Sequence, residues 1–366
     1  MWLSRTKPAL AIGEGILALI GLALWAAASR APLYAQERPK MIVEEDCAQF
    51  AVAPDNKIAC SVQRLKRMKK LLIERDDIWV ADPGGHTKKI VEGEKFMPVP
   101  PPSTYIIESM RWSPDSRRLA ADLTLQQATS EEDSGPPVPH RVIALLNEDG
   151  QEIRVSGSKT RFIEDAMNGA WLADGQTAVY LTGGGPYNIV RVRPAEGKTS
   201  TLFEGHTFDA VVWDPKRNRA FAVGRNLSVL GREALVELDL LHETVSEVGR
   251  VDSAASKLSV SPSGKKVAYF VDGETIEIRD IGSSPKPVRV RVGVGRFEWA
   301  PDEKRIFLKR GLEDKSGNIV WIGIPDGNFH RTLHDLMFHD FEITPDGESI
   351  IVAEPGKKIL KVFPLP

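Results

Sequence analysis

Two pairs of histidine and aspartate are the residues of this sequence best suited to bind a small polar molecule or to act on one. His206 lies three residues before Asp209, and His339 directly precedes Asp340. Imidazole and carboxylate groups serve general acid–base catalysis, and they also bind cations. The two pairs are far apart in the chain, so they form one site only if the fold brings them together.

Sequence motifs of known enzymes are missing from this chain. It has no G-x-S-x-G nucleophile elbow, no H-E-x-x-H zinc helix and no G-x-x-x-x-G-K-[ST] phosphate loop. Its cysteines and histidines lack the spacing of zinc ligands. We therefore predict no catalytic residue, no metal and no cofactor. An enzyme that draws scattered residues together, a hydrolase or a metal-dependent enzyme, stays open as the alternative.

A basic segment near the N-terminal end is a second candidate for binding. Within residues 64–72, five basic side chains are interspersed with apolar ones. Such a segment would contact an anionic partner or a membrane surface, or it is a solvated strand extension or short helix. The basic residues are Arg64, Lys66, Arg67, Lys69 and Lys70.

Seven tight turns, each between two apolar strands, indicate the fold that positions these residues. Proline presets the first corner of such a turn, Asp, Asn or Ser bonds back to the backbone, and Gly accepts a positive φ. The last four turns are spaced by roughly the 40 to 45 residues of a four-stranded blade. We therefore predict an all-β protein, a seven-bladed β-propeller of four-stranded antiparallel blades. The proline positions of the turns are residues 54, 114, 173, 215, 262, 301 and 345.

Tryptophan recurs two residues before this proline position, at Trp112, Trp171, Trp213 and Trp299. A repeated aromatic residue is either a platform for a ligand or a filler between neighbouring blades. Because the position repeats around a propeller, we expect filling between blades.

The turns resemble the WD40-like Pro-Asp repeats of the TolB family, with the closest copies in residues 110–120 and 297–307. The resemblance extends over nearly all of the chain after its N-terminal region. It implies a propeller in an exported, periplasmic protein, and it makes the family's partner, a peptidoglycan-associated lipoprotein, a possible one. This sequence differs in having only a few residues where the family has an α/β domain, and in having seven repeats instead of six.

The N-terminal region has the features of an export signal. Arg5 and Lys7 precede an apolar stretch over residues 15–28, and small residues around Ala35 suit cleavage there. An uncleaved membrane anchor is the alternative, although Glu14 would lie in its first turns. We predict a signal peptide or anchor over residues 1–35 and one propeller domain over residues 36–366. The domain is expected in the periplasm or outside the cell, with anchoring to the inner membrane as the alternative to cleavage.

The last repeat supplies only three strands before the chain stops. Residues 40–44 precede the first hairpin and belong to no other blade. We predict that this segment joins the seventh blade and covers its exposed edge.

Only two cysteines are present, Cys47 and Cys60, and both fall in the first hairpin. A disulfide would contribute on the order of 3 kcal/mol. If Val52 faces Lys57, however, Cys60 pairs with Gln49 and not with Cys47. Two unbonded strand residues are therefore slightly favoured over a bridge.

Charge narrows the class of partner. The net charge is −2, and removing residues 1–35 makes the remainder slightly more acidic. Nucleic acid requires a concentrated basic surface, so we expect no nucleic-acid partner. We expect a monomer that contacts the membrane only through its N-terminal region.

Two places in the predicted ring are candidates for function. One rim carries the long connections of the first two blades, residues 64–74, 95–105 and 126–140, and long loops on a rigid scaffold often bind partners. The other place is the channel mouth, where His206, Asp209 and His339 enter. The predicted function is an exported, non-catalytic scaffold that binds a protein or envelope component through the long-loop rim, with an enzyme at the channel mouth as alternative. The residues that begin the innermost strands are Gln49, Ser109, Asn168, Ala210, Lys257, Arg296 and Asp340.

Overall fold

The chain divides into two units, residues Met1–Pro39 and Lys40–Pro366. The computed structural model describes residues 40–41, 47–68, 71–96, 103–127, 139–224, 233–251, 255–282, 286–293, 295–310, 317–324, 329–336, 340–354 and 359–365. The predicted signal or anchor lies outside these residues. Within them, no helix has both the length and the apolar character needed to cross a membrane.

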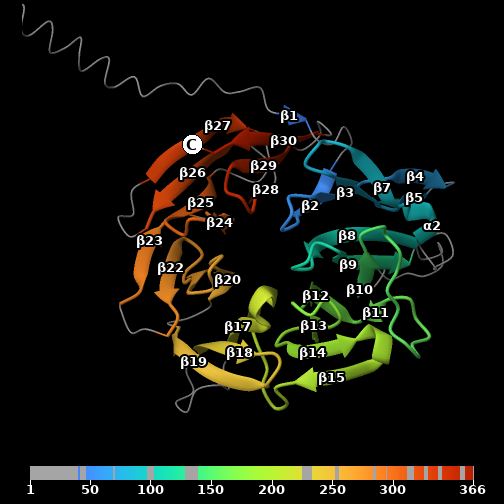
Figure 1. The fold of residues 1–366 in the computed structure, drawn as a ribbon, viewed down its shortest axis with the longest axis horizontal. Helices are drawn as coiled ribbons and strands as arrows, with labels where there is room; N and C mark the ends of the chain where they lie inside the picture. Colours follow the sequence, from blue (N-terminus) through green and yellow to red (C-terminus); the bar gives the residue numbers. More distant parts are fainter. Residues whose placement is uncertain are drawn as a thin grey trace, which may run out of the picture. The chain divides into compact units, whose positions relative to one another are not determined.

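Seven four-stranded antiparallel sheets are arranged as blades around a ring, as predicted (Figure 1). Blades 1 and 2 contain β2 (Cys47–Val52), β3 (Ile58–Val62), β6 (Asp77–Ala81) and β7 (Thr87–Val91), then β8 (Ser103–Trp112), β9 (Arg118–Gln127), β10 (His140–Asn147) and β11 (Ile163–Glu164). Blades 3 and 4 contain β12 (Ala166–Trp171), β13 (Ala178–Thr182), β14 (Asn188–Arg193) and β15 (Lys198–Leu202), then β16 (Ala210–Asp214), β17 (Arg219–Gly224), β18 (Ala234–Asp239) and β19 (Thr244–Arg250). Blades 5 and 6 contain β20 (Ser256–Val260), β21 (Lys266–Phe270), β22 (Thr275–Asp280) and β23 (Val288–Arg291), then β24 (Phe297–Trp299), β25 (Arg305–Arg310), β26 (Gly317–Gly323) and β27 (Phe329–Leu336).

The seventh blade closes the ring with both ends of the described chain. It contains β28 (Asp340–Ile343), β29 (Ser349–Glu354) and β30 (Ile359–Pro364), and its fourth strand is β1 (Lys40–Met41). Lys40 pairs with Val362 and Met41 with Lys361 in antiparallel register. The predicted closure by the N-terminal strand is confirmed for these two residues, and residues 42–44 lie outside the described ones.

The turn between the first and second strand of each blade has the backbone geometry that the repeats predict. In the second blade, the N–H of Ser116 donates to the Ser113 carbonyl at 2.9 Å, and Oδ1 of Asp115 accepts from the N–H of Arg117 at 3.2 Å. One residue in each turn has a positive φ, which Gly and Asn adopt at little cost. These seven residues are Asn56, Ser116, Gly175, Asn218, Gly264, Glu303 and Gly347.

Buried apolar side chains gather in seven clusters, and each cluster lies between two neighbouring blades. The repeated tryptophans belong to these clusters. Trp112 of blade 2 donates its indole N–H to the Ala51 carbonyl of blade 1 at 3.1 Å, and Trp213 of blade 4 donates to Asn168 of blade 3 at 2.6 Å. The prediction that the tryptophans fill the space between blades is confirmed.

A disulfide joins Cys47 to Cys60, with their Cα atoms 5.6 Å apart. The expected register was wrong, because the first turn includes Lys57, whose carbonyl accepts from the N–H of Ala53 at 2.7 Å. Cys60 therefore pairs with Phe50, and an irregularity between Cys47 and Gln49 brings the first cysteine within reach. The alternative of two unbonded cysteines, slightly favoured from the sequence, is wrong for this reason.

Candidate functional site

One rim of the ring, formed by the turns between first and second strands, is held together by contacts from blade to blade. The side chain of Asn56 donates to Asp346 at 2.8 Å, which joins blades 1 and 7. The N–H of Asp55 donates to Oγ of Ser116 at 3.2 Å, which joins blades 1 and 2. Because these turns bind one another, this rim is compact, and its groups are already used within the ring.

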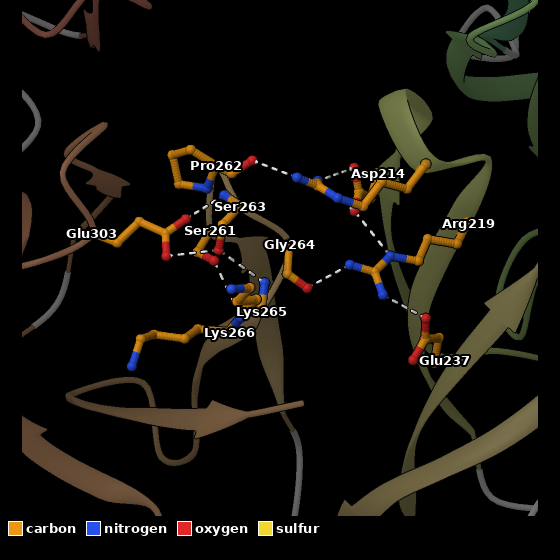
Figure 2. A network of polar contacts seen from close by, with 11 residues as sticks. Asp214, Arg219, Glu237, Ser261, Pro262, Ser263, Gly264, Lys265, Lys266 and Glu303 are labelled. Atoms are coloured by element: carbon orange, nitrogen blue, oxygen red, sulfur yellow. Dashed lines mark hydrogen bonds and ion pairs between the residues drawn. The ribbon is translucent and has the colours of Figure 1, made fainter. Parts of the chain in front are cut away.

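The same rim shows its densest contacts across blades 4, 5 and 6 (Figure 2). Arg219 pairs with Asp214 at 2.9 Å and with Glu237 at 2.5 Å, and it also donates to the Gly264 carbonyl of blade 5. On the other side of that turn, Oγ of Ser263 donates to Glu303 of blade 6 at 2.8 Å. One turn is thus held from both neighbouring blades.

A two-stranded hairpin that belongs to no blade extends from blade 1, between its second and third strands. It consists of β4 (Leu65–Met68) and β5 (Leu71–Glu74), and Figure 1 shows it at the outer edge of the ring beside the short helix α2 (Gly93–Phe96). The basic segment is therefore a strand extension, which is one of the two purely structural alternatives given in the sequence analysis. It projects from the molecule. Lys69 and Lys70 lie outside the described residues.

Ion pairs fix the base of this hairpin. Nε of Arg64 lies 3.0 Å from Oδ2 of the buried Asp77, which also pairs with Lys89 at 2.9 Å. Burial alone would raise the pKa of Asp77. The N–H of Gly93 and the charges of Lys89 and Arg64 outweigh burial and hold this pKa below its usual value. Lys66 pairs with Glu94 of α2 at 2.8 Å. The hairpin thus projects from an anchored base.

The exposed part of the hairpin combines apolar and basic groups. Leu65 keeps 53% of its surface exposed, which is the largest value among the exposed apolar residues of the described chain. Arg67, on the same strand face, is also exposed. Beside them lies a hollow of about 440 Å³, lined by residues that include Arg64, Leu65, Lys66, Arg75 and Glu92.

The second candidate is a cavity of about 380 Å³ in the centre of the ring. Its wall extends from the starts of the innermost strands to the turns of the compact rim. Of the residues predicted to begin the innermost strands, four line it: Gln49, Ser109, Arg296 and Asp340. Glu342 and Arg111, which lie two residues further along their strands, line it as well.

Four charged residues of blades 6 and 7 form a cluster around Arg296. Its guanidinium donates to Oε1 of Glu298 at 2.9 Å and to Oδ1 of Asp340. Glu342 is more distant, with Oε1 3.7 Å from Nη2, and its Oε2 accepts from the N–H of Val52 in blade 1 at 2.8 Å. One guanidinium thus lies near three carboxylates, and Glu342 is the carboxylate farthest from it.

The crowding of negative charge changes the protonation of this cluster. Removal from bulk water raises the pKa of Glu342 to about 8, Arg296 opposes the rise, and the charges of Glu298 and Asp340 add to it. Burial also raises the pKa of Glu298. Although burial disfavours a charged Arg296, the surrounding carboxylates raise its pKa. Glu342 is therefore largely protonated at neutral pH, while Arg296 stays charged.

Arg111 on blade 2 lines the same cavity, but its hydrogen bonds go to neutral acceptors and not to carboxylates. Its Nη1 donates to Oδ1 of Asn168 and to the carbonyl of Gly169, both at 2.9 Å. Burial lowers the pKa of Arg111, and the charges of Asp122 and Glu342 oppose this. Within the described chain, its Nε and Nη2 donate no hydrogen bond, and Arg111 lines the cavity.

Other predicted site residues lie elsewhere. His206 is in the turn between blades 3 and 4, where its N–H donates to the Phe203 carbonyl at 3.0 Å, and the N–H of Asp209 donates to Val223 at 2.7 Å. Blades 4 and 7 lie on different sides of the ring (Figure 1), so these residues do not meet Asp340. Lys257 of blade 5 donates to the Gly295 carbonyl at 3.1 Å. His339 is outside the described residues, and no metal-binding group of three His, Cys, Asp or Glu occurs within them.

The sequence interpretation missed Arg111, Glu298 and Glu342. Each lies three residues before the proline position of its repeat. In a strand, this position shares a face with the position five before the proline. Reading both positions of every repeat would therefore have found them.

Comparisons with known proteins bear on the fold alone. No family model matches the chain, and no curated protein matches it. Among solved structures, a chain from the crystal structure of a mitotic checkpoint complex is similar, with a TM-score of 0.57 and 15% identity over 90% of this chain and 94% of that one. The likeness supports a seven-bladed propeller and says nothing further about activity.

Proposed function

We propose that this chain is an exported, non-catalytic β-propeller scaffold that binds a protein or cell-envelope component through the rim carrying the long connections of blades 1 and 2. The observation that carries the proposal is the projecting hairpin of β4 and β5, which exposes Leu65 beside Arg67. A projecting element that exposes an apolar side chain beside a basic one combines the apolar core and the polar rim of a protein interface.

The contrast between the two rims supports this side of the ring. Turns on the opposite rim bind one another, as Asn56 binds Asp346 and Arg219 binds Gly264. The hairpin instead uses its base for anchoring and leaves its outer face to solvent. Its basic and apolar character suits an acidic partner with an apolar patch. The chain of similar fold from the mitotic checkpoint complex comes from an assembly of proteins, which agrees with a scaffold role.

A double substitution in the hairpin tests the proposal. Leu65→Ser with Arg67→Glu removes the apolar group and reverses the charge while keeping Arg64 and Lys66, which anchor the base. The control is Lys304→Glu, an exposed residue on the opposite rim. Quantitative affinity capture from envelope extracts should lose specific proteins with the hairpin variant and keep them with the control. An identical captured set for all three proteins would contradict the proposal.

Export is tested separately. Residues 1–39 fused to a reporter that is active only outside the cytoplasm should give an active reporter, and mass spectrometry of the full chain should show whether cleavage follows Ala35. An inactive reporter would contradict export without affecting the hairpin experiment. A reporter that is active but retains residues 1–35 would favour the anchor over the cleaved signal.

A further inference from the structure

Three charged groups that line the central cavity remain after its close ion pairs are accounted for: Arg111, Lys216 and Glu342. Arg296 is satisfied by Glu298 and Asp340. Glu342 lies 3.7 Å from that guanidinium and receives one hydrogen bond, from a neutral backbone N–H. Arg111 binds only neutral acceptors among the described residues. Lys216 lies in the turn Pro215–Arg217 of blade 4, so on the innermost strands of blades 2 and 7 one base, Arg111, and one acid, Glu342, are left over.

The two groups lie on either side of blade 1. Arg111 is on β8 of blade 2 and Glu342 on β28 of blade 7, and the corresponding position on β2 of blade 1 is Ala51. All three line the cavity. The charge of Glu342 influences Arg111, yet no ion pair joins Arg111 to any described residue. Ala51 is buried in the core cluster of blades 1 and 2, so it adds no polar group to the cavity wall between the acid and the base.

We propose that this cavity binds a small zwitterion, a molecule that carries a carboxylate and an ammonium group, between Arg111 and Glu342. The carboxylate of the ligand accepts from Nε and Nη2 of Arg111, the two nitrogens with no partner in the described chain. The ammonium group donates to Glu342. An arginine fork suits a carboxylate, and an ion pair shielded from bulk water is stronger than one on the surface.

A purely anionic or purely cationic ligand fits the lining less well. An anion would satisfy Arg111 but would add a negative charge to a cavity that Glu342 and Asp340 also line. A cation would satisfy Glu342 but would leave the free nitrogens of Arg111 unpaired. A cavity of about 380 Å³ has room for an amino acid and its hydration water. The inference concerns the channel and does not depend on the hairpin.

Binding of the ammonium group should be linked to a proton. The charged groups that face Glu342 are Arg296 and Glu298 from blade 6, Asp340 from its own strand and Arg111 from blade 2. With its pKa near 8, Glu342 is mostly protonated at pH 7. An ammonium group favours the ionised form, so binding at pH 7 should release a proton, and the release should shrink as the pH rises from 7 to 8.5.

Isothermal titration calorimetry of the full chain tests the proposal with glycine, β-alanine and 4-aminobutyrate as probes. Acetate and ethylammonium, matched in ionic strength, each lack one of the two charges. At least one amino acid should bind ten or more times tighter than either single-charge probe. Titration in two buffers of different ionisation enthalpy should show the released proton.

Variants assign the site. Arg111→Gln and Glu342→Gln should each weaken the best amino acid at least tenfold, and Glu342→Gln should also abolish proton release. Glu342→Gln keeps an oxygen for the Val52 N–H. If Arg111→Gln does not fold, Arg111→Lys, which keeps the charge and loses the fork, should weaken binding. The exposed substitutions Arg154→Gln and Glu148→Gln are matched controls and should have no effect.

Three results would overturn the proposal. Acetate binding as tightly as the amino acids would show an anion site, and ethylammonium doing so would show a cation site. No binding of any of the three amino acids at 20 mM, which would nearly fill a site with a Kd of about 1 mM, would show a channel filled by water alone. Each result is independent of the captured proteins that test the hairpin.

Discussion

The indole N–H of Trp112 donates to the Ala51 carbonyl across a blade boundary at 3.1 Å, whereas the indole N–H of Trp171, at the same position of the next repeat, is buried with no partner among the described residues. Both side chains are almost fully buried, at 5% and 1% exposure. The two tryptophans therefore fill similar spaces and differ in one hydrogen bond.

This difference predicts unequal costs for the same substitution. Trp112→Phe and Trp171→Phe remove similar volume, but only the first leaves a carbonyl without its donor, and the second removes an unsatisfied N–H. Trp112→Phe should lower the free energy of unfolding by about 1 to 2 kcal/mol more than Trp171→Phe. Urea unfolding followed by circular dichroism measures both. Equal losses would mean that the bond between blades contributes nothing net.

Much of the ring could be predicted from the sequence because one local feature repeats seven times. A turn with a required positive φ is coded by a few adjacent residues, as Gly264 and Gly347 illustrate. Closure of the ring by the N-terminal strand was also predictable, since the last repeat supplies only three of its four strands. These features depend on neighbours in the chain and not on distant contacts.

The sites were less predictable because they depend on distant residues. The sequence between β4 and β5 is Lys69-Lys70. It contains neither the Asn nor the Gly from which a tight hairpin turn is usually predicted. The cavity depends on Ala51 lying between Arg111 and Glu342, which come from three different blades. His206 and Asp340 were both expected at the channel mouth, yet they belong to different sides of the ring.

Reduction of the disulfide should destabilise the propeller. The bond between Cys47 and Cys60 closes a loop with a sequence separation of 13. In the chain-entropy account, such a loop contributes about 3 kcal/mol to the free energy of unfolding. Denaturant unfolding with and without a reductant should show this loss, and the Cys47→Ala, Cys60→Ala double variant should be insensitive to reductant. A wild-type midpoint that does not change on reduction, verified by thiol titration, would contradict the expectation.

Glu342 should make the stability of the fold depend on pH in a known direction. Its pKa is about 8 in the folded protein and near 4.5 when unfolded, so the folded state holds the extra proton between these values. Stability from this group is fully present below pH 4.5 and is lost as the pH rises through 8. Glu342→Gln removes the effect, so relative to pH 5 the variant should gain on the wild type by on the order of 4 kcal/mol near pH 9, since each pKa unit corresponds to about 1.4 kcal/mol.

The comparison between the two proteins isolates Glu342 from other groups. Burial also raises the pKa of Asp76, to about 7, so the wild type loses stability with rising pH for a second reason. That contribution is the same in the variant and cancels in the difference. Thermal melts at half-unit steps of pH are sufficient. A constant difference between variant and wild type would show that channel water solvates Glu342 as well as bulk water does.

Arg219 should be the most sensitive position on the compact rim. It pairs with the buried Asp214 and with Glu237, and it reaches the Gly264 carbonyl of the next blade (Figure 2). Arg219→Leu would leave Asp214 with Arg217 as its remaining partner, and the loss should be on the order of 2 to 4 kcal/mol. The exposed pair of Arg193 with Glu196 provides the control, since Arg193→Leu should cost less than about 0.5 kcal/mol.

A double-mutant cycle separates the loss of the ion pair from the loss of the bond between blades. Asp214→Asn removes the carboxylate charge while Arg219 still reaches Gly264. If the ion pair carries most of the effect, Arg219→Leu should cost less in the Asp214→Asn background than in the wild type, by about 1 to 3 kcal/mol. If the bond to the next blade or the pair with Glu237 carries it, the cost should be the same in both backgrounds. The interaction free energy from urea unfolding of the four proteins decides between these two physical causes.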